Sequence, residues 1–198
     1  PWSAKWAFRN SRHCVYDFRW THGIGRLLRD LQDIRHLKKK AAELAKLILR
    51  LKKRYPKLPV YLVGHSAGTG IILFATEHLP PGSVDRIVLL ASAVAPDYDL
   101  RPALRATKRE LVSYYSPLDF VILGWGTSQF GTADRYYGRS AGLEGFRIPS
   151  QLTESDQKLY QRLTQIKWKP SMLPFFGGLH NSSSMPLFLT RYVVPWIR

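Results

Sequence analysis

The chain has 198 residues, 45% of them hydrophobic, which is enough to bury a core, and we predict a single domain over residues 1–198. Its single cysteine, Cys14, excludes an internal disulfide, no Cys/His spacing is typical of a metal site, and no apolar run approaches the roughly 20 residues that cross a bilayer. The net charge of +16 favours anionic partners, but no nucleic-acid-binding motif accompanies it, and we interpret it first as a solvated basic surface.

The first elements predicted are a short helix and a strand. Trp2 and Trp6 are four residues apart and share one helical face near the N-terminus. His13–Trp20 has the apolar centre Cys14-Val15-Tyr16 and is predicted to be a strand, which would bury the thiol of Cys14 and leave it unreactive. A glycine-containing loop, residues 21–25, follows this strand.

A long amphipathic helix is predicted over Leu27–Arg54. Its apolar residues recur at steps of three and four and make one stripe: Ile34, Leu37, Ala41, Leu44, Ala45, Ile48 and Leu51. The opposite face of residues 35–57 is rich in lysine and arginine, which suits weak contact with an anionic surface or lipid. A solvated outer face of a helix packed on a sheet is the interpretation we favour. The helix is expected to end at Tyr55-Pro56, because the residue before a proline is pushed out of the helical region.

Residues 60–70 carry the most informative motif. Val60–Val63 is a short β-branched apolar run that predicts a buried strand, and helical character resumes over Ile71–Glu77. Between them, Gly64-His65-Ser66-Ala67-Gly68 fits the G-x-S-x-G pattern. In this pattern a serine stands on a tight turn above the sheet, glycines let strand and helix approach, and the helix N-terminus stabilises negative charge. A glycine-rich turn with an idle serine is the competing interpretation.

This strand, turn and helix resemble the core of the α/β-hydrolase superfamily, on its lipase and esterase side, and the likeness runs in order over residues 12–198. The resemblance implies an α/β fold with a mostly parallel sheet flanked by helices on both faces. It also implies a triad of serine, acid and histidine, in that chain order, with Ser66 as nucleophile. The elbow residues would be Gly64, His65 and Gly68, with His65 structural and the backbone N–H of Ala67 as one oxyanion donor.

The second oxyanion donor is the weak point of the resemblance. In the family, further strands and the loop that supplies this donor precede the part matched here, which implies an N-terminally truncated or reduced form. Residues 21–25 have two interpretations: either they are a plain glycine turn, or His22-Gly23-Ile24-Gly25 imitates the His-Gly loop that supplies the donor in lipases. We favour the first, because the family normally places another strand between that loop and the elbow.

Two further buried parallel strands are predicted after the elbow, Asp85–Ala91 and Leu111–Tyr115, separated by a short helix over Arg101–Arg109. Open α/β sheets bind ligands beyond the carboxyl ends of their strands, and aspartates follow both strands there. Asp119, in Ser116-Pro117-Leu118-Asp119, resembles the family's triad acid, and an aspartate that closes an Asx-turn is the competing interpretation. The alternative acids are Asp97, Asp99 and Asp134.

The rest of the chain is predicted to cover and complete the site. Residues 120–149 lack periodicity and are rich in glycine and aromatics, which is typical of either a small lid over an apolar acyl pocket or an irregular connection. A polar helix over Ser150–Ile166 and a last strand near Met172–Phe176 follow. His180 lies in the glycine loop after that strand, where the family places its catalytic base. An amphipathic helix, Met185–Ile197, closes the fold.

These residues predict a serine hydrolase that cleaves a small-molecule carboxylic ester through an acyl-enzyme, with Ser66 as nucleophile, His180 as base and Asp119 orienting the base. We expect no cofactor, no metal and no specific nucleic acid. Two alternatives stay open: a thioesterase or amidase of the same fold, and a non-catalytic or impaired hydrolase scaffold whose basic surface binds an anionic partner. No signal peptide is recognisable in these residues, and their compartment does not follow from them.

Overall fold

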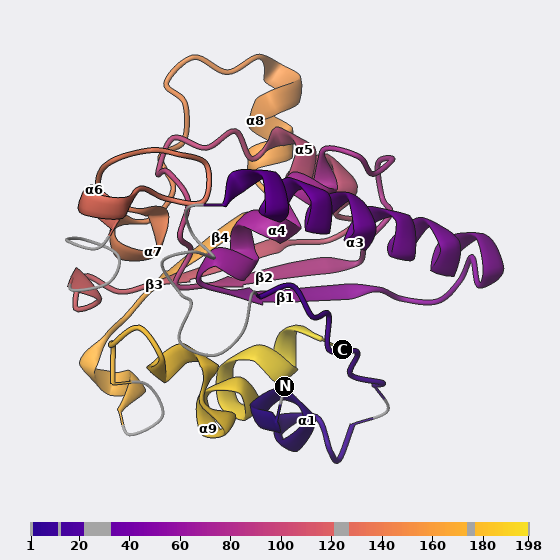
Figure 1. Ribbon diagram of the computed structural model, residues 1–198, viewed down its shortest axis with the longest axis horizontal. Helices are drawn as coiled ribbons and strands as arrows, with labels where there is room; N and C mark the ends of the chain where they lie inside the picture. The colour runs from indigo at the N-terminus through magenta and orange to yellow at the C-terminus, as the bar shows by residue number, and fades with distance from the viewer. Residues whose placement is uncertain (1, 12, 22–32, 121–126, 174–176, 198) are drawn as a thin grey trace.

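The structure is a computed structural model, and it describes all residues except 1, 12, 22–32, 121–126, 174–176 and 198 (Figure 1). The strands are β1 (Tyr61–His65), β2 (Arg86–Leu90), β3 (Leu111–Tyr115) and β4 (Leu163–Lys167). The α-helices are α1 (Trp2–Ala7), α3 (Ile34–Arg54), α4 (Ala67–Thr76), α5 (Arg101–Ala106), α6 (Thr127–Phe130), α7 (Ala141–Glu144), α8 (Glu154–Tyr160) and α9 (Pro186–Phe188). Short 3₁₀ turns are η2 (Pro170–Met172), η3 (Ser182–Ser184) and η5 (Val194–Trp196), and η4 (Leu189–Val193) is π-helical.

Within the described part of the chain, the four strands form one parallel sheet in the order β1-β2-β3-β4. Helices α4, α5 and α8 each lie between neighbouring strands in sequence and pack, together with α3, on one face of the sheet. The opposite face is covered by α1, α9 and η4, so that the two ends of the chain lie on the same side (Figure 1). The predicted α/β fold class, a parallel sheet with helices on both faces, is therefore confirmed.

The strands supply apolar side chains to both faces because successive residues of a strand point in opposite directions. Leu62, Ile87 and Leu111 are buried under α3 and α4, whereas Val88, Val112 and Tyr114 are buried under α1 and α9. Strands that are apolar on both faces are typical of a parallel sheet covered by two layers of helices. This explains why β1, β2 and β3 could be predicted from short continuous apolar runs.

Helix α3 packs on the sheet by the predicted stripe, of which the most buried members are Leu37, Ala41, Leu44, Ala45 and Ile48. The helix begins at Ile34, not at Leu27, because Asp33 is its N-cap and accepts a hydrogen bond from the backbone N–H of His36 at 3.0 Å. Residues 27–32 of the predicted helix lie outside the described residues. The helix ends at Arg54, so residues 55–57 of the basic stretch lie beyond it. Its exposed cations are Arg35, Lys38, Lys39, Lys46, Arg50, Lys53 and Arg54.

Helix α4 is buried on all sides, between α3 and the sheet. Its approach to neighbouring segments depends on two glycines. A Cβ atom on Gly64 would lie 2.8 Å from Cδ1 of Ile72, and one on Gly70 would lie 2.7 Å from Cβ of Ala133. The first glycine lets β1 contact α4, and the second lets residues 131–134 close over α4. The strand-turn-helix unit is therefore held in place by contacts that leave no room for a side chain at either position.

The strand predicted over His13–Trp20 is absent. These residues form no strand, and Cys14, predicted to be buried, is exposed. Val15 packs in the core under α1 and α9, while Phe18 and Trp20 pack in the core under α3 and α4. The segment thus passes from one face of the sheet to the other, and a chain that crosses the layers cannot stay aligned with the strands.

The predicted end of the chain also needs correction. Among the described residues the last strand is β4, whose residues Leu163–Ile166 fall inside the predicted helix Ser150–Ile166; of that helix, α8 is present. Of the strand predicted near Met172–Phe176, Met172 instead ends the 3₁₀ turn Pro170–Met172, and residues 174–176 lie outside the described residues. Met185–Ile197 is not one helix but the succession α9, η4 and η5, and Pro195 in η5 cannot donate the backbone hydrogen bond that an α-helix needs.

Candidate active site

Ser66 stands on the sharp turn between β1 and α4, at the carboxyl end of the sheet. Its backbone has φ 55° and ψ −129°, in a region that residues with a side chain rarely adopt. The turn is held by the N–H of Ser66, which donates to the carbonyl oxygen of Leu90 at 3.0 Å, and by Thr69, whose N–H and hydroxyl donate to the carbonyl oxygen of Ser66 at 3.0 and 2.6 Å. The backbone thus has the strained geometry that the elbow pattern predicts.

Three side chains from distant parts of the sequence form one chain of hydrogen bonds. Nε2 of His180 lies 2.9 Å from Oγ of Ser66, and Nδ1 of His180 lies 2.7 Å from Oδ2 of Asp119. A carboxylate can only accept, so Nδ1 carries the proton of the neutral ring and Nε2 is free to accept from the serine hydroxyl. All three side chains are buried: Ser66 is 6% exposed, Asp119 4% and His180 9%. Water therefore competes little for these contacts.

Asp119 is brought to His180 by the turn that follows β3. Its N–H donates to the carbonyl oxygen of Ser116 at 3.1 Å, and Oγ of Ser116 accepts from the N–H of Leu118 at 3.2 Å. Burial raises the pKa of Asp119 above its ordinary value. This effect is larger than that of the hydrogen bond from His180, which lowers the pKa. The backbone of Asp119 and the hydroxyl of Ser116 thus hold this turn, while the carboxylate of Asp119 faces His180.

The loop that carries His180 approaches the Asp119 turn closely at Gly178. This glycine has φ 78°, and a Cβ atom there would lie 2.8 Å from Cδ1 of Leu118 and 3.1 Å from Cε2 of Trp168. Only glycine combines that backbone conformation with that space. The glycine loop is thus required for His180 to reach both Ser66 and Asp119.

His65, predicted to be structural, holds the same loop from the other side. Its Nε2 lies 2.8 Å from the carbonyl oxygen of His180, which can only accept, so Nε2 of His65 donates. The two imidazole rings lie 4.9 Å apart, measured between their centroids. Burial lowers the pKa of His65 to about 4, so the ring is neutral at neutral pH and adds no positive charge beside His180.

This lowered pKa predicts a dependence of stability on pH. In the unfolded chain His65 has its ordinary pKa of 6.5, so between about 6.5 and about 4 the unfolded state binds a proton that the folded state does not. The contribution of His65 to the free energy of unfolding is therefore fully present above pH 6.5 and is lost as pH falls towards 4. Urea unfolding at a series of pH values should show that the free energy of unfolding falls less steeply with falling pH in His65→Gln than in the wild-type protein. His78→Gln, at an exposed position after α4, should match the wild type; equal slopes for all three would contradict the prediction.

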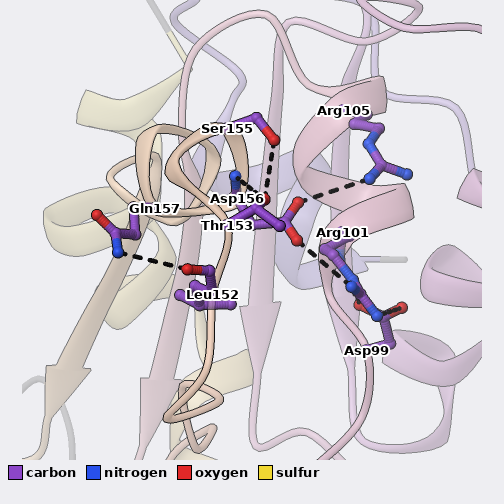
Figure 2. A network of polar contacts seen from close by, with 8 residues as sticks. All are labelled: Asp99, Arg101, Arg105, Leu152, Thr153, Ser155, Asp156 and Gln157. Carbon is purple, nitrogen blue, oxygen red and sulfur yellow. Dashed lines mark hydrogen bonds and ion pairs between the residues drawn. The ribbon is translucent and has the colours of Figure 1, made fainter.

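The alternative acids are engaged elsewhere. Asp97 pairs with Arg147 at 3.2 Å on the surface, and Asp99 pairs with Arg101 at 2.8 Å in the network that joins α5 to α8 (Figure 2). Asp134 accepts from the N–H of Ala95 at 3.1 Å and from the hydroxyl of Thr132. Of the acids considered from the sequence, the structure thus brings Asp119 to His180.

The surroundings of the nucleophile include residues that the sequence did not single out. Trp20 lies over the elbow, because a Cβ atom on Gly68 would be 3.5 Å from its Nε1, and it packs with Ala67, Ala91, Ala93 and Leu143. Ala67 is the first residue of α4, and the first N–H groups of a helix have no acceptor within the helix. Its N–H is therefore available as an oxyanion donor. His22–Gly25, the predicted alternative source of a second donor, lies outside the described residues.

Searches for two other kinds of feature were negative. Within the described ranges, His, Cys, Asp and Glu side chains nowhere gather in a group that could hold a metal ion. In the same part of the chain, every helix is too short or too polar to span a bilayer.

Comparison with known proteins supports the assignment of the fold. The family model Hydrolase_4, described as serine aminopeptidase, S33, matches residues 6–133, which is more than half of the chain. The matched region includes the elbow and Asp119 and ends before His180. A search of curated proteins found no match.

Proposed function

The chain belongs to this serine aminopeptidase S33 family of α/β-hydrolases, and we propose that it is a serine hydrolase that cleaves carboxylic esters. The observation that carries the proposal is the buried chain of hydrogen bonds from Ser66 through His180 to Asp119, with distances of 2.9 and 2.7 Å. A nucleophile within hydrogen-bond reach of a base, which is itself oriented by a third group, is the arrangement that covalent catalysis requires.

The reaction would proceed in two halves. Oγ of Ser66 attacks the ester carbonyl carbon while Nε2 of His180 takes its proton, and Asp119 holds Nδ1–H and stabilises the charged ring. The N–H of Ala67 donates to the oxyanion that forms. When the tetrahedral intermediate collapses, the C–O bond to the alcohol breaks and His180 returns the proton to the departing oxygen. A water molecule, deprotonated by His180, then attacks the acyl-enzyme and releases the acid and Ser66.

The family's description as serine aminopeptidase favours a second candidate, the release of an N-terminal amino acid from a peptide. Such a substrate carries an ammonium group, which is best bound by an unpaired carboxylate near the nucleophile. Glu144 follows Leu143, which packs with Ala67, but it is paired with Arg139 at 3.3 Å and with Arg147 at 3.0 Å. This pairing supports the ester proposal over the aminopeptidase.

A fluorophosphonate probe tests for an activated serine. We expect the wild-type protein to be labelled and Ser66→Ala not to be labelled. Hydrolysis of p-nitrophenyl esters should then exceed hydrolysis of aminoacyl p-nitroanilides; the opposite order would favour the aminopeptidase. If the folded wild-type protein is not labelled, the catalytic proposal is wrong. The basic outer face of α3 would then be tested as a contact site by sedimentation with vesicles that contain anionic lipid.

A further inference from the structure

A hollow of about 400 Å³ lies at the carboxyl edge of the sheet, between the ends of β3 and β4 and helix α7. Three of the residues that line it are charged, and the others are mainly aromatic or aliphatic. The lining residues that matter here are Arg139, Glu144 and Lys167, with Tyr115, Phe120 and Leu143. We refer to this feature as the basic hollow.

The basic hollow adjoins the proposed catalytic residues through the chain and through packing. Phe120 directly follows Asp119, and Leu143 packs with Ala67, the residue next to Ser66. Tyr115 and Lys167 are paired in register at the ends of β3 and β4, so their side chains leave the sheet on the same face. Leu143 therefore borders both the elbow and the basic hollow.

The wall formed by α7 is fixed to the sheet by hydrogen bonds. Oε1 of Gln165 in β4 accepts from the N–H of Phe146 at 2.6 Å, and its Nε2 donates to the carbonyl oxygen of the same residue at 2.9 Å. On the other side of α7, the N–H of Gly142 donates to the carbonyl oxygen of Ser92 at 2.8 Å. The carbonyl oxygen of Gly142 accepts from the backbone N–H of Ser116 at 2.9 Å. The backbone of α7, which carries Leu143 and Glu144, is thus positioned before any ligand arrives, which lowers the entropic cost of binding.

The charges in the basic hollow do not cancel. Glu144 is shared by two cations, Arg139 at 3.3 Å and Arg147 at 3.0 Å. Lys167 is exposed and takes part in no ion pair or side-chain hydrogen bond with the described residues. Lys167 lines the basic hollow together with Arg139, whose guanidinium already holds the carboxylate of Glu144. These charges favour the binding of a second carboxylate.

We propose that the basic hollow binds a carboxylate carried by the substrate, with Lys167 as its main partner and Arg139 as the second. This inference rests on the proposed function, since it names the substrate class of the same site: esters of dicarboxylic acids in which one carboxylate stays free. The aromatic side chains of Tyr115 and Phe120 would contact the aliphatic part of such a substrate.

The first test measures the binding of glutarate to the whole protein by NMR titration at low salt. Lys167→Gln should weaken binding about tenfold or more, as expected for the loss of one charged hydrogen bond. Lys46→Gln, which removes the same charge from the outer face of α3, should bind as the wild type does. Absence of glutarate binding, or equal binding in the two variants, would overturn the proposal.

The second test compares kcat/KM for the mono-p-nitrophenyl ester of glutaric acid and the neutral p-nitrophenyl valerate. The wild type should prefer the anionic ester, and Lys167→Gln should lose this preference about tenfold, whereas Lys46→Gln should keep it. Hydrolysis of both esters without any effect of Lys167 would reject the inference and leave the proposed function standing. Binding of glutarate that depends on Lys167, without hydrolysis of either ester, would support the basic hollow as a carboxylate site and reject the proposed function.

Discussion

His180→Ala should lower kcat for a p-nitrophenyl ester by roughly 10⁴- to 10⁶-fold, because without the imidazole nothing accepts the proton of Ser66 during attack. The hydrogen bond of 2.9 Å between Nε2 and Oγ is the reason that we propose His180 as the base for this step. The rate is measured by release of p-nitrophenol at saturating ester, and reactivity with the fluorophosphonate probe should be lost in parallel.

His78→Ala is the matched control for this substitution, since it removes an exposed imidazole from the turn after α4. It should retain the wild-type kcat and the wild-type rate of labelling. If His180→Ala keeps more than a tenth of the wild-type kcat while its far-UV circular dichroism and unfolding midpoint are unchanged, His180 is not the base.

Asp119→Asn should lower kcat by about 10⁴-fold with little change in KM. The carboxylate accepts the proton on Nδ1 of His180 at 2.7 Å, which leaves Nε2 able to accept from Ser66. An amide can donate to Nδ1 instead, and the ring then carries its proton on Nε2, where it cannot act as a base. The expected signature is therefore a protein that folds and binds ester but turns it over very slowly.

The alternative acids provide the controls for this prediction. Asp97→Asn and Asp99→Asn each remove one partner of an exposed ion pair, and such pairs contribute little to stability. Both variants should keep kcat within about a factor of two of the wild type. A loss of kcat in Asp97→Asn or Asp99→Asn that equals the loss in Asp119→Asn would contradict the assignment of the acid.

Much of the fold could be predicted because its signals are local. Strands β1, β2 and β3 each contain a short apolar run, and the glycines around Ser66 mark the turn between strand and helix. Ser66, Asp119 and His180 were predicted from their positions after strands, and parallel strands bring such positions to one edge. His180 meets the other two even though strand β4 was not predicted, because Gly178 lets its loop return to the Asp119 turn.

Other features could not be predicted because they depend on contacts between distant segments. Strand β4 has the sequence Leu-Thr-Gln-Ile-Lys, and its residues are only partly buried, so its pattern does not stand out from a polar helix. The segment His13–Trp20 has the composition of a strand but crosses between the two faces of the sheet. The basic hollow joins Arg139 to Lys167, and no local pattern links residues so far apart in the sequence.

At Ser66 the protein gives up stability for activity, because the backbone is strained at the residue that carries the proposed nucleophile. A residue with a side chain at φ 55° and ψ −129° costs about 1–3 kcal/mol, and glycine adopts such a conformation without this cost. Gly at position 66 would therefore give a more stable protein that has lost the hydroxyl. Laboratory evolution that rewarded only resistance to heat would drive this position towards glycine, whereas selection that also required activity would retain serine.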